Sequence, residues 1–169
     1  MASKTNPAQV TELLLQALET ERGGIQIYTA AIAAAQNEDL KKEWGEYLEE
    51  TRTHEQVLTR LFEELGMDTE AQSPGRAVVA HMGESLVAAI KLAMAKADPA
   101  AAELVAAECV VLAETKDHQN WELIGRVAEQ GGPHAKALKA AHEAVEQDED
   151  HHLYHTKGWC RELWIQSLG

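Results

Sequence analysis

Glutamate and histidine residues interrupt apolar stripes at helical spacing in four separate stretches of the sequence. An unpaired carboxylate in an apolar interior costs several kcal/mol, so four of them together rival the stability of a whole domain. Two divalent cations would neutralise four carboxylates and take the histidine nitrogens as ligands. The candidate ligands are Glu21, Glu50, His54, Glu114, His118, Glu146, Glu149 and His152.

Each stripe follows alternating steps of three and four residues, which is the signature of an amphipathic helix. Every stripe has a Glu near its middle, and three of the four have a His one turn later. In the fourth expected helix the stripe is Leu104, Ala107, Val111, Glu114, His118 and Trp121.

A single Glu or His on an apolar stripe is more often a hydrogen-bonded core residue or lies at a wet edge. Its recurrence on four stripes favours metal binding. The alternative is a relic site, in which the glutamates pair with Arg22, Arg52 or a nearby His, or stay protonated because burial raises their pKa.

The stripes lie in helices expected at residues 8–36, 40–65, 98–130 and 134–168, with a further apolar helix at 75–97. Residues 1–7 are expected to be a disordered lead-in, and 8–169 a single domain. A short turn lies within each of two antiparallel hairpins, and the helix at 75–97 is a long crossover between them. This arrangement predicts an all-α, ferritin-like four-helix bundle rather than an up-down-up-down one.

Composition and charge exclude several classes of function. The net charge of −13 over 169 residues argues against binding nucleic acid or an anionic membrane. Cys109 and Cys160 are far apart and form no metal-binding CxxC pair. The N-terminus has no signal-peptide pattern, and no uninterrupted apolar run is long enough to span a bilayer. We therefore expect a cytoplasmic protein.

The sequence also contains an internal repeat. Glu21 is followed seven residues later by Tyr28, and Glu114 seven residues later by Trp121. The second helix of each half then brings an acidic stretch, LEET at 48–51 and VEQDE at 145–149. Two similar halves would place two metal ions about a pseudo-twofold axis.

These motifs resemble the ferritin-like superfamily, in which a Glu with an aromatic residue seven positions on alternates with Glu-x-x-His. Glu149 and His152 match the second pattern. The segment YLEETRTHEQVLTRLFEELG (47–66) is similar to the second helix of YciE/YciF-like stress proteins, and DPAAAELVAAE (98–108) and the later EQGG fit their second half.

One departure from the superfamily pattern lies in the second helix. It has Glu50-x-x-x-His54, and Thr51 takes the usual Glu position. His54 would then ligate a metal through a local π-bulge, or hydrogen-bond Glu50 from one turn away. In the last helix, Glu146 is an alternative ligand to Glu149.

The resemblance implies a di-iron or di-manganese protein that oxidises Fe(II) or consumes dioxygen or peroxide in oxidative-stress protection, with manganese-catalase-like chemistry as a variant. It implies that Glu50 and Glu114 or Glu149 bridge the ions, with Glu21 and the histidines as terminal ligands. The competing hypothesis is a metal-free bundle that acts as a stress-related binding protein. Trp159 and Trp164 in the C-terminal tail suggest a homodimer contact.

Overall fold

The computed structural model describes residues 5–169 and consists of five helices. They are α1 (Pro7–Ala34), α2 (Glu38–Leu65), α3 (Pro74–Lys96), α4 (Pro99–Glu129) and α5 (Ala135–Leu168). No strand occurs in residues 5–169, so the prediction of an all-α bundle is confirmed. Residues 1–4 of the expected lead-in lie outside the described residues, and the rest of it is shorter than predicted because α1 begins at Pro7.

The helices begin and end at residues that satisfy their free backbone groups. The side chains of Asn37, Ser73 and Asp98 each accept a backbone N–H in the first turn of α2, α3 and α4. Gly66 ends α2 with a φ of 66°, a left-handed conformation that suits glycine. The break between α4 and α5 contains Gly131, also with a positive φ.

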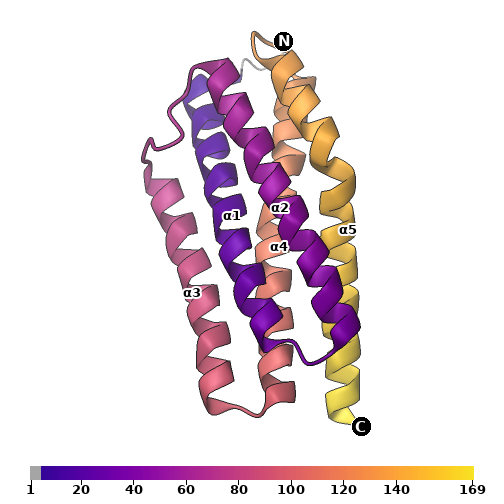
Figure 1. Ribbon diagram of the computed structural model, residues 1–169. Coiled ribbons are helices and arrows are strands. Elements are labelled where there is room, and N and C mark those ends of the chain that lie inside the picture. Colours follow the sequence, from indigo (N-terminus) through magenta and orange to yellow (C-terminus); the bar gives the residue numbers. More distant parts are fainter. Residues whose placement is uncertain (1–4) are drawn as a thin grey trace.

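Four helices form the bundle and one lies outside it. α1 contacts α2 and α4, and α5 contacts α4 and α2, so these four helices close a ring around the interior. α3 packs against α1 and α4 only, and runs along the outside of the bundle at the left of Figure 1. The chain therefore forms two hairpins, α1–α2 and α4–α5, and α3 carries it from one to the other.

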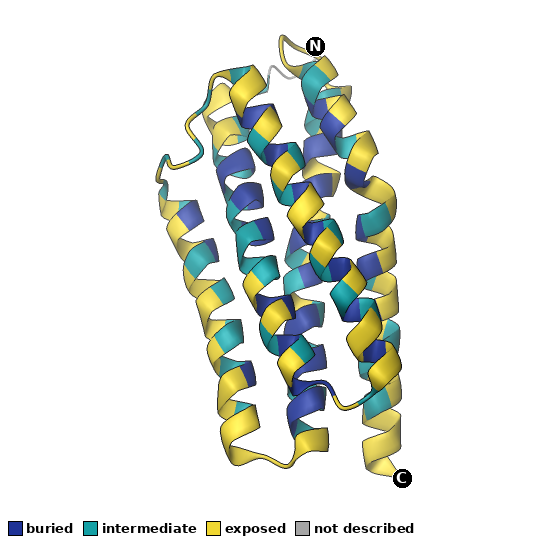
Figure 2. Ribbon diagram, viewed as in Figure 1, coloured by how far each residue is buried: buried dark blue, intermediate teal, exposed yellow. Residues whose placement is uncertain are grey.

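The interior has two apolar halves separated by a polar layer. One half contains Tyr28, Trp44 and Ile90, and the other contains Leu18 and Trp121. Along each of the four bundle helices the buried residues pass from one half to the other through buried polar residues. The dark blue residues of Figure 2 follow the inward faces of these helices.

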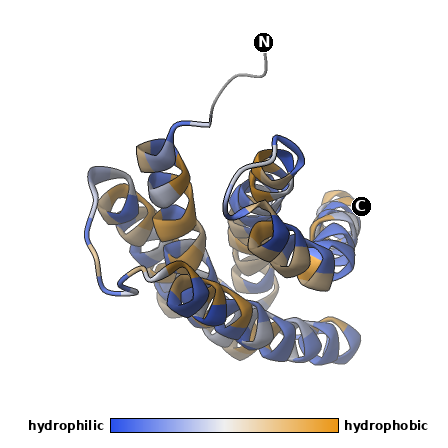
Figure 3. Ribbon diagram, turned by 90° about the horizontal axis from the view of Figure 1, so that it is seen from above, coloured by the Kyte–Doolittle hydropathy of each residue, from blue (hydrophilic) through white to orange (hydrophobic). Residues whose placement is uncertain are grey.

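Among the helices in residues 5–169, α3 alone is long and apolar enough to cross a membrane, judged by length and composition only. Glu84 and Lys91 interrupt its apolar sequence. One of its faces packs on the bundle, where Gly83 crosses close to Gly23 of α1. Viewed from above, the helices carry both hydrophobic and hydrophilic residues (Figure 3).

Buried charged side chains fix the connections between helices. Arg76 is 3% exposed; its Nε donates to Glu19 at 2.8 Å, and its Nη1 donates to the carbonyls of Thr69 and Ala71 in the α2–α3 loop. Glu103 of α4 accepts two backbone N–H groups from the α1–α2 turn, at 2.8 and 2.7 Å. The Arg76 contacts hold α3 and the α2–α3 loop against α1. The Glu103 contacts hold α4 against the turn of the α1–α2 hairpin.

Replacing Arg76 with Met should therefore destabilise the fold. The variant leaves Glu19 and two loop carbonyls without their buried donor, a loss of about 3–5 kcal/mol for a broken buried ion pair. Chemical denaturation measures this difference. The exposed Arg60 provides the matched control, and Arg60→Met should change stability by less than about 0.5 kcal/mol. Equal effects of the two variants would contradict this role of Arg76.

Candidate metal centre

The polar layer brings together five of the eight ligands predicted from the sequence. All five are at most 3% exposed, and they come from all four bundle helices: Glu21 (α1), His54 (α2), Glu114 (α4), and Glu149 and His152 (α5). The expectation that His54 points inward is met. α2 is an α-helix from Glu38 to Leu65, so the His54 side chain reaches the interior without a π-bulge.

A sixth buried residue of the layer, Asp117, was not predicted, and it is the fourth acid there. It is 5% exposed and lies three residues after Glu114, while the His118 side chain is 24% exposed and bonds Asp150 at 2.7 Å. The predicted α4 stripe stepped four residues from Glu114, but the buried face steps three residues there and then four to Trp121. The available signal was the Glu114-x-x-Asp117 spacing, which matches Glu149-x-x-His152.

Glu50 and Glu146 do not reach the centre of the layer. The Glu50 side chain is 42% exposed, and it bonds the outer nitrogen of His152. The Glu146 side chain is 59% exposed and lies 3.8 Å from His142. Thr51, at the position where the superfamily pattern has Glu, is buried, and its hydroxyl bonds the backbone carbonyl of Tyr47 at 2.8 Å.

The two halves of the repeat exchange their aromatic hydrogen bonds. Trp121, seven residues after Glu114, donates its indole N–H to Glu21 at 2.7 Å. Tyr28, seven residues after Glu21, donates its hydroxyl to Glu114 at 2.5 Å. Each aromatic residue thus orients the glutamate of the other half and leaves the second oxygen of that glutamate free to face the layer.

The two histidines are oriented in the same reciprocal way. The Nε2 of His54 bonds Asp148 of α5 at 3.2 Å, and the Nε2 of His152 bonds Glu50 of α2 at 2.7 Å. An ionised carboxylate only accepts hydrogen bonds, so these contacts favour the tautomer of each ring that has its hydrogen on Nε2 and its lone pair on Nδ1. Both Nδ1 atoms are buried and face the carboxylates of the layer.

Ligand atoms converge in two groups that share one residue. Glu21, Asp117 and Glu149 each place an oxygen within 4.8 Å of the others, and so do the ligand atoms of His54, Glu149 and His152. The His54 Nδ1 lies 3.0 Å from the Glu149 Oε1. Two electron pairs at this separation repel unless a proton or a cation lies between them.

Within residues 5–169, no Lys or Arg side chain forms an ion pair with the acids of the layer. In residues 5–169, nine buried side-chain nitrogen or oxygen atoms lack a hydrogen-bond partner, and seven of them belong to this cluster. Arg22 pairs with Glu55 and Glu70 instead, Arg52 pairs with Glu49, and neither forms an ion pair with the buried acids. The orphaned atoms are Glu21 Oε2, His54 Nδ1, Glu114 Oε2, Asp117 Oδ1, both carboxylate oxygens of Glu149 and His152 Nδ1.

Burial shifts the pKa values of this cluster toward neutral forms. Loss of hydration raises the pKa of Glu114 to about 7, although the bond from Tyr28 opposes the rise. Loss of hydration and then neighbouring negative charge raise the pKa values of Asp117 and Glu149 well above the ordinary range. Burial, followed by the neighbouring histidines, lowers the pKa of His152 to about 3, so its Nδ1 is available as a ligand at neutral pH.

A small surface cavity of about 90 Å³ reaches the layer between α4 and α5. Its lining includes Glu149 from the cluster and Trp121, which holds Glu21. His118 and Glu146, two predicted ligands that lie outside the cluster, also line it. The cavity gives a small molecule or ion an approach to Glu149 from solvent.

Comparison of the chain with protein-family models, curated proteins and solved structures finds no match.

The raised pKa of Glu114 predicts that the free energy of unfolding of the metal-free protein depends on pH. Between pH 4.5 and 7 the folded chain holds a proton on Glu114 that the unfolded chain has lost, so this residue makes stability fall as pH rises. Glu114→Gln keeps an acceptor for Tyr28 but cannot ionise. In the presence of a chelator, the Glu114→Gln variant should be more stable than wild type by about 3 kcal/mol at pH 8, and equally stable near pH 4.

Denaturant titrations of wild type and Glu114→Gln across this pH range measure the difference in their free energies of unfolding. His152 contributes an opposite pH dependence to both proteins, so it cancels from this difference. Glu146→Gln is the exposed control and should follow wild type throughout. A Glu114→Gln variant that is no more stable than wild type at pH 8 would show that Glu114 ionises without cost.

Proposed function

We propose that this protein is a ferritin-like dimetal carboxylate protein that binds two Fe or Mn ions in its polar layer and reacts with dioxygen or peroxide. One observation carries the proposal: two groups of buried ligand atoms share Glu149, and seven atoms of the cluster have no partner. Two hairpins joined by a helix along the outside are also the arrangement that the ferritin-like resemblance implies.

The charges of the layer balance when two divalent ions are bound. Ionised Glu21, Glu114, Asp117 and Glu149 carry a charge of −4, and two divalent cations supply +4. Glu21 and Asp117 would hold one ion, His54 and His152 the other, and Glu149 would bridge them. The Oε2 of Glu114 has no hydrogen-bond partner and lies 3.7 Å from the Nδ1 of His152, beside the place of the second ion. Asp117 would thus supply the fourth carboxylate of the set, and Glu50 would lie outside it.

The surrounding residues prepare these ligands before any ion arrives. Tyr28 and Trp121 fix one oxygen of each glutamate, and Asp148 and Glu50 fix the ring orientation and protonation of the two histidines. Such outer hydrogen bonds set the position and basicity of metal ligands. The apolar halves on both sides exclude water, and the cavity at Glu149 admits small molecules.

When bound, a pair of Fe or Mn ions would supply one-electron redox chemistry toward a small oxidant. A carboxylate-rich set with two imidazoles suits both metals. The proposed activity is oxidation of Fe(II) with consumption of dioxygen or peroxide, in keeping with a protective role in oxidative stress. Peroxide disproportionation is the variant that the same residues would support with manganese.

Metal content tests the ligand assignment. Protein loaded anaerobically with Fe(II) and then dialysed should retain about two ions per chain, as two-metal sites do. Glu149→Gln removes the charge of the shared ligand and should lose at least one ion. Glu146→Gln and His118→Ala alter residues that the sequence suggested but that lie outside the cluster, so both should retain two ions. Equal iron content in all four proteins would refute the assignment.

Chelation distinguishes the proposal from a metal-free binding protein. Ions that bind only the folded chain stabilise it by about 2.7 kcal/mol at a hundredfold excess over Kd. Calorimetry at neutral pH should show that a chelator lowers the melting temperature and that added Fe(II) or Mn(II) restores it. A melting temperature that responds to neither treatment favours the metal-free or relic alternative.

Activity is tested by mixing the Fe(II)-loaded protein with dioxygen or with peroxide. We expect Fe(II) to be oxidised faster than by the Glu149→Gln variant and by the same concentration of free Fe(II). Absorbance of Fe(III) reports the rate, and an oxygen electrode reports dioxygen consumption or its release from peroxide by the Mn(II)-loaded protein. Rates indistinguishable from free metal ions with both oxidants would exclude the proposed activity while leaving metal binding intact.

A further inference from the structure

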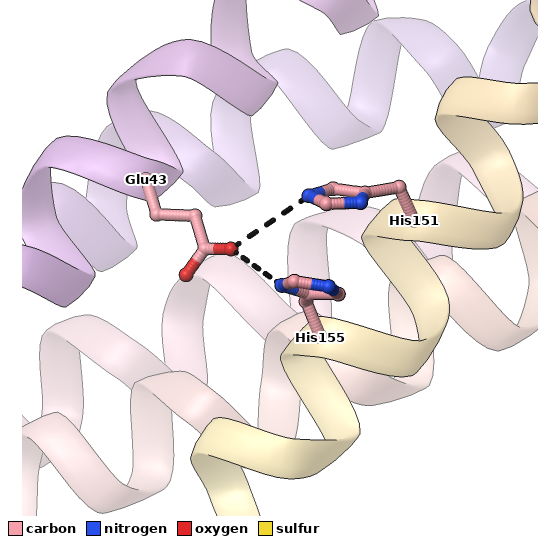
Figure 4. A group of neighbouring side chains, drawn as sticks. All are labelled: Glu43, His151 and His155. Carbon is pink, nitrogen blue, oxygen red and sulfur yellow. Dashed lines mark hydrogen bonds and ion pairs between the residues drawn. The ribbon is translucent and has the colours of Figure 1, made fainter.

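A second group of metal-ligand side chains lies outside the polar layer, on the solvent side of α2 and α5. Glu43 of α2 faces His151 and His155 of α5, as Figure 4 shows. The Glu43 Oε1 lies 3.0 Å from the Nδ1 of His155 and 4.0 Å from the Nε2 of His151. Neither the predicted ligand set nor the proposed dimetal centre uses these residues.

The side chains of this group are already positioned. His151 and His155 are one helical turn apart, and their rings stack with centroids 3.7 Å apart and planes 28° apart. Glu43 accepts hydrogen bonds from the Tyr47 hydroxyl at 2.5 Å and from the Trp159 indole. Burial would raise the pKa of Glu43, but these bonds and the one from His155 outweigh it and lower the pKa, so Glu43 is ionised at neutral pH.

We propose that Glu43, His151 and His155 form a separate, solvent-facing site for a divalent transition ion of the zinc class. Two imidazoles and one carboxylate are the ligand set of zinc sites with an open fourth position. The three ligand atoms lie within 4.8 Å of one another. Zinc–ligand bonds of about 2.0–2.2 Å place the ligands of one tetrahedral ion about 3.4 Å apart, so small side-chain rotations close the site.

Exposure and charge suit this site to exchange with solvent. The side chains of both histidines are 51% exposed, whereas that of Glu43 is 19% exposed. An ion can therefore enter without opening the bundle, and the fourth ligand is a water molecule. The net charge of −13 favours cation approach. The site does not require the dimetal centre to be occupied, because none of its three residues belongs to that cluster.

Zinc titration of the full-length protein tests the proposal. We expect the double variant His151→Ala/His155→Ala to bind one Zn²⁺ fewer per chain than wild type in calorimetry. Loss of an outer hydrogen-bond partner lowers the affinity of a metal site by roughly 100-fold at most. Removal of both imidazoles, which are ligands, should lower the zinc affinity of this site by more than that. His81→Ala/His134→Ala is the matched control, since neither residue belongs to a ligand group, and it should bind as wild type does.

Two further variants separate this site from the dimetal centre and from a folding defect. Glu149→Gln should lose ions from the centre yet keep the zinc ion that depends on His151 and His155. Glu43→Gln preserves an acceptor for Tyr47 and Trp159 and should still remove the visible absorption of tetrahedral Co²⁺ at this site. The proposal is overturned if wild type and the His151/His155 double variant bind equal numbers of Zn²⁺ with equal Kd, or if Glu43→Gln leaves the Co²⁺ spectrum unchanged.

Discussion

The burial of four carboxylic acids in one layer of a helical bundle is the constraint on which the other features of this structure depend. Glu21, Glu114, Asp117 and Glu149 are each at most 5% exposed, and no Lys or Arg within residues 5–169 forms an ion pair with them. Their raised pKa values express the cost of ionising them together. In the proposed dimetal protein the same cost would drive the uptake of cations, because bound cations would remove the repulsion that ionisation creates.

The repeat explains how so many polar groups are held in place. In each half, an aromatic residue seven positions after a glutamate bonds the glutamate of the other half. In each second helix, an acid four positions before a histidine bonds the histidine of the other half, through Glu50 and Asp148. The bonds cross between hairpins, so the layer forms only when both hairpins pack together. Folding and preparation of the centre are therefore one event.

The two halves of the repeat differ at two positions, which carry acids of the polar layer in the second half only. Glu149 and Asp117 of the second half correspond to Thr51 and Gly24 of the first. A Cβ atom on Gly24 would lie 3.2 Å from the Thr51 side chain, which is tighter than an ordinary contact. A side chain at Gly24 would therefore press on Thr51 in the first half, whereas the second half has an acid at both corresponding positions. Of these two acids, Glu149 lines the surface cavity.

The sequence by itself determined the five helices and most of the centre. Capping residues, glycines and a helical period fixed the helix ends to within a few residues, and the α1, α2 and α5 stripes identified Glu21, His54, Glu149 and His152 as inward-facing. The choice between Asp117 and His118 was decided by tertiary structure. Consecutive helical residues point about 100° apart, and a stripe that allows steps of three or four leaves that rotation undetermined. Only the packing of α4 against α1 and α5 selects the buried residue. The partners of Glu50, Trp121 and Tyr28 were likewise decided by tertiary structure, because each lies on the opposite hairpin, about 86 to 102 residues away in sequence.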